Sequence, residues 1–209
     1  MADQKQGLKV IKKKWFPIFA SKEFEEANIG ESLVASASDL VGRIVSVNLM
    51  SLTNDIKLQH ITLKFKIIGA DNDKATADLI GFEIIPPAIR RLVRRGVDRI
   101  DDSFICETVD NKKIRVKPFI LTKSYARGLV GNRLRKAMID YIAKEAKKVT
   151  FDDLVKNLLG NKFQTSIKAE LKKIYPIKSC EIKSVSVVLK GKPMDVKEDK
   201  LTEEAPEEA

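Results

Sequence analysis

The segment that follows Pro86 carries four arginines within six residues, Arg90, Arg91, Arg94 and Arg95. Proline is tolerated in the first turn of a helix, so a short helix is predicted here, and residues four apart would share a face. No acidic residue lies in this stretch, so the positive charges repel one another until anions bind. A guanidinium binds phosphate through two parallel hydrogen bonds. The four arginines therefore predict contact with phosphates, and the alternative is a purely solvated helix face.

A second set of basic residues follows residue 110. One part alternates along a predicted strand, and another lies in a loop that also supplies hydroxyl groups and an aromatic ring. The loop leads into a predicted helix, whose N-terminal backbone amides favour anions as well. We predict RNA contacts from Lys113, Arg115, Lys117, Lys123, Tyr125, Arg127, Arg133, Arg135 and Lys136.

Residues 1–20 are predicted to form a basic N-terminal arm with an aromatic anchor. Lysines dominate its middle, and a polar, lysine-rich segment is expected to be disordered without a partner. The aromatic segment 15–19 is expected to dock on the core. For Trp15 itself, packing on the core is favoured over stacking on a base. The predicted RNA contacts of this arm are Lys12, Lys13, Lys14 and Trp15.

Catalytic chemistry has little support in the sequence. His60 is the only histidine, and it is expected on the polar face of a strand with no partner to orient it as a general base. Cys106 and Cys180 have no metal-ligand spacing, and buried thiols in a reduced, cytosolic setting are expected. The adjacent acids Asp101 and Asp102 are expected in a solvated turn. Phosphate-binding glycine loops are absent, so the sequence predicts no enzyme, no cofactor and no metal site.

The charge distribution indicates a polyanionic partner. The chain of 209 residues has a net charge of +10, and its last fifteen residues carry seven acids and two lysines, which leaves +15 on residues 1–194. Such an excess favours nucleic acid or an anionic membrane. The predicted helices all have core-facing stripes, which disfavours membrane binding. No single recognition element for duplex DNA is found, and basic clusters on several elements fit folded RNA better.

Hydrophobic periodicity predicts strands first, then helices, then one last strand. The best strand signal, 60–69, alternates Ile61, Leu63, Phe65 and Ile67 with polar residues. Predicted bulges lie at Pro118, where an edge strand is the alternative, and between residues 182 and 185. Helix signals include a capping pair at residues 150 and 153 and a helix C-cap at residue 96. The predicted strands are 45–49, 60–69, 75–85, 103–109, 114–121 and 177–189, and the later helices are 129–149, 150–160 and 163–174.

This order predicts an α+β fold rather than alternating βαβ units. We expect a curved or barrel-like antiparallel sheet, with a C-terminal helical segment packed on it and a final returning strand. Residues 21–194 are predicted to form a single core, strand-rich over 32–122 and helical over 123–175. The acidic tail, 195–209, is expected to be disordered.

Four segments together resemble a known family. They are Lys13-Lys14-Trp15-Phe16, Gly42-Arg43, the run Ser124-Tyr125-Ala126 with the basic helix through Arg135-Lys136-Ala137-Met138, and Ile174-Tyr175-Pro176-Ile177. In their order and spacing they are similar to the archaeal and eukaryotic small-subunit ribosomal protein family eS-one, also written S-three-Ae. The resemblance spans about residues 9–189, and the short chain suggests the archaeal branch.

The resemblance implies a structural place in the small ribosomal subunit, bound to ribosomes in the cytoplasm. It implies contacts with small-subunit rRNA, to which Arg43 is added, and with neighbouring proteins of the platform near the mRNA exit. Messenger RNA and initiation factors are further partners that it suggests, and a membrane is not. The family has no catalytic residues to carry over.

Two other functions remain open from the residues. A free-standing RNA-binding regulator of translation would use the same basic clusters. An enzyme acting on RNA or phosphate is disfavoured, because no acid–base or metal constellation is found.

Overall fold

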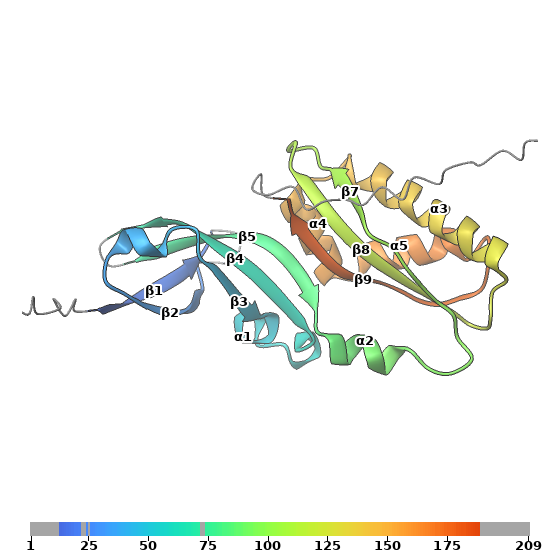
Figure 1. Ribbon diagram of the computed structural model, residues 1–209, viewed down its shortest axis with the longest axis horizontal. Coiled ribbons are helices and arrows are strands. Elements are labelled where there is room, and N and C mark those ends of the chain that lie inside the picture. Colours follow the sequence, from blue (N-terminus) through green and yellow to red (C-terminus); the bar gives the residue numbers. More distant parts are fainter. Residues whose placement is uncertain (1–12, 22–23, 25, 72–73, 189–209) are drawn as a thin grey trace, which may run out of the picture.

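The structure is a computed structural model that describes residues 13–21, 24, 26–71 and 74–188. Its strands form one nine-stranded sheet that is antiparallel except where β1 meets β5. Figure 1 shows an elongated molecule, with β1 to β5 at one end and the later strands with α3, α4 and α5 at the other. The expected α+β fold, with helices in the C-terminal half and a returning last strand, is confirmed.

The N-terminal end is a curled five-stranded part of the sheet. In β4, residues 61, 63, 65 and 67 are buried as the alternation predicted. The curl brings the segment before β3 to β2, where the Arg43 guanidinium donates to Ser32 Oγ (3.3 Å) and to the Asp39 carbonyl (2.9 Å). The strands are β1 (Lys14–Ala20), β2 (Asn28–Val34), β3 (Ile44–Asn48), β4 (Ile61–Ala70) and β5 (Ala75–Ile84).

Short helices lie in the connections from β2 to β3 and from β3 to β4. The predicted strand 45–49 stops one residue early, because the Asn48 side chain accepts a hydrogen bond from the Met50 amide and caps a helix. The short helices are η2 (Ala37–Leu40), α1 (Leu49–Thr53) and η3 (Ile56–Leu58).

Strands β5 and β9 join the two ends. They pair over only three residues each, and Gly81 lies opposite Ser186. A Cβ atom on Gly81 would lie 3.0 Å from the Val185 carbonyl oxygen, so a side chain here would push β5 and β9 slightly apart. Helix α2 (Pro86–Leu92) follows β5 directly at this junction.

The C-terminal end packs helices on the sheet. Helix α5 contacts β9, α4 and α3, and α3 also contacts β7. The Thr150 hydroxyl accepts from the Asp153 amide at 3.3 Å, so the predicted cap of α4 is confirmed. The elements are β6 (Arg99–Asp101), β7 (Phe104–Glu107), β8 (Lys113–Thr122), α3 (Gly128–Ala146), α4 (Phe151–Leu159), α5 (Lys162–Leu171) and β9 (Ile177–Val187).

The two predicted bulges, at Pro118 and between residues 182 and 185, correspond to a single bulge where β8 pairs with β9. Lys117 pairs with Ser184 and Pro118 pairs with Ile182, so Lys183 is the extra residue on β9. Strand β8 is an interior strand, because β9 pairs along it and β6 and β7 pair with it as well. The bulge, and not an edge, therefore accommodates the proline.

Two expectations need comment. Residues 15–19, expected to be the arm's aromatic anchor, lie within β1 of the sheet. The long helix predicted over 129–149 spans 128–146. Residues 1–12 and 195–209 lie outside the described residues, and the division into arm, core and tail stays a prediction.

Candidate nucleic-acid interface

The four arginines after Pro86 do not form the predicted stacked pairs. Helix α2 ends at Leu92, because Val93 takes an extended conformation. Arg90 and Arg91 therefore lie in its last turn, while Arg94 and Arg95 follow in the connection to β6. The predicted cap at residue 96 is also wrong, since the glycine there adopts φ +81° in a later turn.

All four arginines remain exposed. None forms an ion pair with any residue that the structure describes. A positive charge in the last turn of a helix is favourable on its own, which accounts in part for Arg90 and Arg91. Arg94 and Arg95 lie beyond the end of the helix, so the helix dipole does not stabilise their charges. This group is an accessible cation cluster at the junction of the two ends.

The cations of β8 share one face of the sheet. Lys113, Arg115 and Lys117 alternate with Ile114 and Val116, which are buried on the other face. Lys113 pairs with Glu107 at 3.6 Å, and both side chains are more than half exposed, so this ion pair is weak. Within the described ranges, the other two cations have no acidic partner.

Strand register extends this basic face across the sheet. Arg115 lies opposite Ser186, Ser186 lies opposite Gly81, and Gly81 lies opposite Lys64 of β4. The two residues between these cations, Gly81 and Ser186, are small. Lys64 and Lys66 alternate with the buried residues of β4 and were not among the predicted RNA contacts. Lys64 forms an ion pair with Glu83.

The loop 123–127 is held in place by hydrogen bonds. The Tyr175 hydroxyl accepts from Ser124 (2.9 Å) and donates to the Tyr125 carbonyl (3.0 Å). The Ala126 amide donates to Asp98 Oδ2 at 2.6 Å. The Tyr125 ring is nevertheless 73% exposed. A fixed loop thus presents an open aromatic ring, a suitable platform for a base.

Two exposed cations flank this ring just before α3 begins. They are Lys123 and Arg127, and Arg127 occupies the N-cap position of α3 without a side-chain cap hydrogen bond. Arg133 and Lys136 are exposed further along the helix. The loop and the first turns of α3 form a second accessible cation cluster.

Arg135 differs from its neighbours on α3. Its Nε lies 3.5 Å from Asp102 Oδ2, and its Nη2 donates to the Asp101 carbonyl at 3.5 Å. The same Asp102 oxygen is buried and has no hydrogen bond, so 3.5 Å is an ion-pair contact only. The expected solvated turn at this acid pair is wrong, because Asp101 ends β6 and pairs with Arg99 at 2.7 Å.

The N-terminal prediction is corrected at one residue. Trp15 is 64% exposed, so the expected packing on the core is wrong. Phe16 and Ile18 alternate with it along β1 and take the buried face. Lys13 and Lys14 are exposed, and Lys12 lies outside the described residues. Arg43, bound to Asp39 and Ser32 as described above, ties β2 to the segment before β3.

The groups considered for catalysis are poorly placed for it. Cys106 and Cys180 are free and buried as predicted, and burial raises their pKa values to about 11 and about 12. Over the described residues, no group of three or more His, Cys, Asp or Glu side chains could hold a metal ion. The same part of the chain contains no helix with the length and hydrophobicity needed to cross a membrane.

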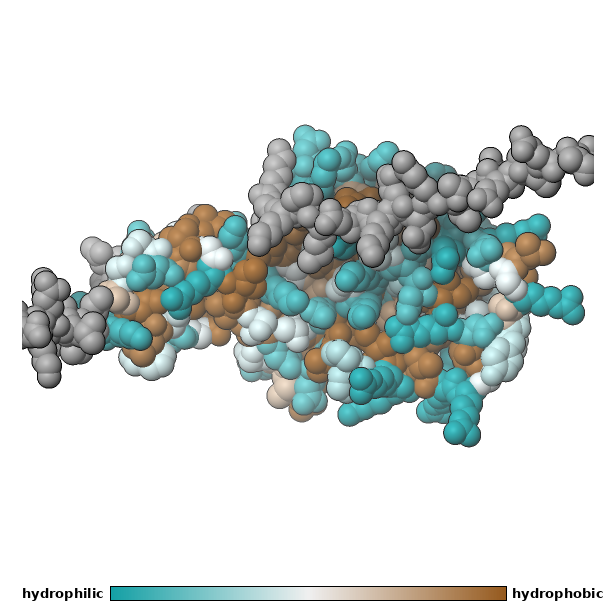
Figure 2. Space-filling model, in the orientation of Figure 1, coloured by the Kyte–Doolittle hydropathy of each residue, from teal (hydrophilic) through white to brown (hydrophobic). Residues whose placement is uncertain are grey.

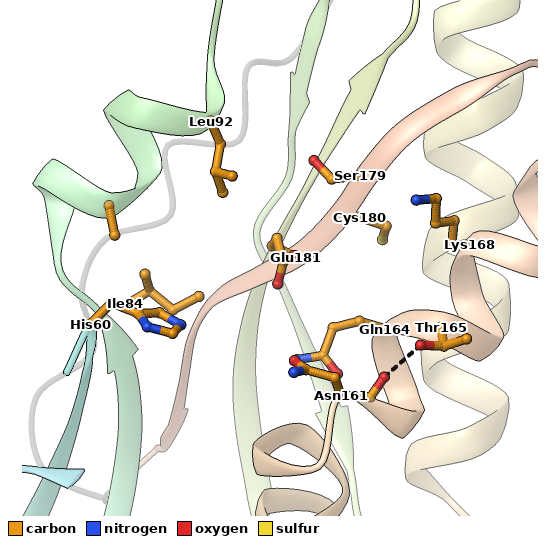
Figure 3. Close-up of a pocket in the computed structure, with 11 residues that line it drawn as sticks. His60, Ile84, Leu92, Asn161, Gln164, Thr165, Lys168, Ser179, Cys180 and Glu181 are labelled. Atoms are coloured by element: carbon orange, nitrogen blue, oxygen red, sulfur yellow. Dashed lines mark hydrogen bonds between the residues drawn. The ribbon is translucent and has the colours of Figure 1, made fainter. Parts of the chain in front are cut away.

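One feature has no sequence signal. His60, half-buried, lines a cavity between α2 and α5 together with Gln164 and Glu181 (Figure 3). These residues come from distant parts of the chain, so no local spacing in the sequence predicts that they lie together.

Comparisons with known proteins identify the family to which the chain belongs. Residues 2–191 match the model of the Ribosomal S3Ae family. The small ribosomal subunit protein eS1 of Halorubrum lacusprofundi is 30% identical over 91% of this chain and 87% of its own length. The proteins of the same name from Nanoarchaeum equitans and Methanothermobacter thermautotrophicus are each 32% identical, over 84% and 81% of this chain and 89% and 87% of their own lengths.

Proposed function

The chain belongs to the Ribosomal S3Ae family, and we propose that it is a structural constituent of the small ribosomal subunit, binding small-subunit rRNA. The observation that carries this proposal is the set of exposed cations without acidic partners on separate elements. They lie at the end of α2 and in the loop that leads into α3, and Lys117 adds one on the face of β8. Relatives that cover most of the chain bear the name of a small-subunit protein. No enzymatic activity is proposed.

The mechanism is neutralisation of phosphates by cations that the fold holds apart. Each phosphate contact releases counterions, so affinity falls as salt rises. The hydrogen-bonded loop 123–127 and the sheet face of β8 hold their groups in register before RNA arrives. Less ordering entropy is then lost on binding. Cations on several sides suit a protein surrounded by folded RNA.

We further propose a position on the platform of the small subunit, near the mRNA exit. Neighbouring platform proteins are the expected protein partners, and mRNA and initiation factors would approach the same region. The protein would then act in the cytoplasm, bound to the ribosome. This position follows from the family resemblance and from no contact in the structure.

A double charge reversal, Arg91→Glu with Arg95→Glu, tests the rRNA contact. Binding to small-subunit rRNA should weaken, and the slope of log affinity against log salt should fall by about two. Circular dichroism should be unchanged, because both side chains are exposed. The matched control is Lys148→Glu with Lys173→Glu, two lysines that already pair with Glu145 and Glu170. Equal binding by the two double variants would remove the α2 cluster from the interface.

Sedimentation through sucrose gradients at low and high salt tests the structural role. A small-subunit constituent should be present in near-equimolar amount and should stay bound at high salt. A soluble pool, or loss at modest salt, would instead identify a free-standing RNA-binding regulator of translation.

A further inference from the structure

A cavity of about 260 Å³ lies where the two ends of the molecule meet, between α2 and the pair formed by α5 and β9 (Figure 3). Pockets for drug-sized ligands span roughly 300–1,000 Å³, so this one suits a single flat ring system. It adjoins the arginine cluster of α2. The position at a junction also matches the common placement of binding sites between structural units.

The cavity has one apolar side and one polar side. Ile84 of β5 with Ala88 and Leu92 of α2 form the apolar side, and Gln164 of α5 and Glu181 of β9 lie opposite (Figure 3). A nucleobase needs this combination, because its faces are covered by apolar groups and its edge is bound by polar ones.

The polar side carries hydrogen-bond acceptors that have no donors. Gln164 is 6% exposed, and its Nε2 donates to the Leu158 carbonyl at 3.1 Å, which fixes the amide and leaves Oε1 without a partner. Ser179 Oγ is likewise buried and unpartnered. Glu181 forms no hydrogen bond or ion pair within the described part of the chain, and burial raises its pKa. Acceptors in such surroundings are costly until a donor arrives.

Cations line a neighbouring hollow and one side of the cavity itself. A second hollow, of about 500 Å³, shares His60 and Ala88 with the first and is lined by Lys57 and Arg91. Lys168, inside the first cavity, donates from Nζ to the Lys178 carbonyl at 2.6 Å. The buried acceptors Gln164 Oε1 and Ser179 Oγ therefore lack donors, and Lys57 and Arg91 lack an acidic partner within the described residues, so a nucleotide could bring N–H groups to the former and a phosphate to the latter.

We propose that this cavity binds one unstacked guanine of an RNA strand whose phosphate lies beside Lys57 and Arg91. The proposal rests on the rRNA-binding function proposed above. Guanine carries N1–H and N2–H side by side, so it can donate two hydrogen bonds to the Glu181 carboxylate. Adenine and cytosine each offer one exocyclic amine and no adjacent ring N–H, so they satisfy the carboxylate less well. The apolar side covers the ring face.

A basic side chain from a neighbouring protein would also bring N–H donors. It would, however, add a positive charge beside Lys57, Arg91 and Lys168, at a desolvation cost that one carboxylate must offset. A neutral base avoids that cost, and its phosphate interacts favourably with the rim. The surrounding charge therefore favours RNA over a protein side chain as the occupant.

The test is chemical probing of intact small subunits with kethoxal, which adds to N1 and N2 of accessible guanines. Subunits would carry the wild-type chain, Glu181→Gln, Thr165→Trp or Glu170→Gln. Glu181→Gln removes the double acceptor at nearly constant shape, and Thr165→Trp closes the exposed rim of the cavity without altering its acceptors. Glu170→Gln is the matched control, because that exposed acid on α5 does not line the cavity and pairs with Lys173.

The expected result is one guanine that is protected in wild-type and Glu170→Gln subunits and about tenfold more reactive with both cavity variants, as loss of a charged hydrogen bond implies. Unchanged guanine reactivity in subunits that hold a full complement of Glu181→Gln chain would overturn the inference and leave the ribosomal role intact. A cross-link from the cavity to a protein side chain would also overturn it. Absence of the chain from small subunits would refute the proposed function, and the inference with it.

Discussion

The two ends of the molecule bury the same kind of sheet in different ways. At the N-terminal end the sheet curls around its own core, with Phe65 and Ile18 inside. At the C-terminal end α5 lies against β9, and α3 and α4 complete the layer that encloses Phe151. Figure 2 shows hydrophobic residues along the visible face of the curled end, while hydrophilic ones project from the outline of the other. The two cation clusters, at the end of α2 and in the loop that leads into α3, lie at the junction and at the helix-covered end, whereas the exposed Lys13 and Lys14 lie at the curled end.

Core truncation in each end gives the largest expected effect. Phe65→Ala and Phe151→Ala each remove a fully buried ring and should lower the free energy of unfolding by about 3–5 kcal/mol. Trp15, the only tryptophan, reports on the curled end, and far-ultraviolet circular dichroism reports on the helices. If residues 21–194 form a single core, both probes should give one coincident urea transition in both variants. A shift seen by one probe alone would divide the predicted core into two units.

The sequence predicted some features of the two ends correctly, because these features depend on residues that are close together in the chain. The alternation in β4, the cap at Thr150 and the bulge beside Pro118 each follow from steric rules that act over a few residues. The end of α2 was predicted wrongly. The spacing of the four arginines fits a longer helix, but it does not reveal that the backbone becomes extended at Val93. Trp15 was misplaced because its strand was not recognised.

The cavity could not be predicted from the sequence. His60, Leu92, Gln164 and Glu181 line one cavity because β5 pairs with β9 and α2 follows β5 directly. Such a meeting depends on long-range pairing and leaves no periodic signal. The basic clusters were easier, because charge is visible in the sequence. The sequence does not show which cations already have partners within the protein. Arg43 and Arg135 are examples, because they contact the Asp39 carbonyl and the Asp102 carboxylate.

Adding a methyl group where β5 meets β9 tests how tightly the two ends are joined, and it should change stability less than the core truncations do. In Gly81→Ala the new Cβ atom would meet the Val185 carbonyl oxygen at 3.0 Å, and overpacking of this kind costs about 1–3 kcal/mol. Gly128→Ala is the control, because nothing lies within 4 Å of its Cβ, and a gain of about 0.4–1 kcal/mol is expected from the stiffer unfolded chain. Urea midpoints measure both. Equal effects would mean that β5 and β9 adjust freely, and that the ends are loosely joined.

The smallest effect concerns the junction's buried acid. Burial raises the pKa of Glu181, and Lys168 partly opposes this. The folded chain then holds this proton more tightly than the unfolded chain, so stability falls as pH rises through the range above the ordinary value of 4.5. Glu181→Gln does not titrate. The variant should therefore be more stable than the wild type at neutral pH, and this advantage should disappear under acidic conditions.

Unfolding by urea across that pH range measures the difference. Glu170→Gln should show the opposite sign, because it loses an exposed ion pair with Lys173, and exposed pairs contribute about 0.2–1 kcal/mol. If Glu181→Gln instead lowered stability at neutral pH, the carboxylate would already be satisfied in the folded chain. The cavity would then have no spare charged acceptor for a guanine edge. A gain in stability, in contrast, would mean that the junction keeps an unsatisfied acid at a cost to the free chain, as expected of a group reserved for a ligand.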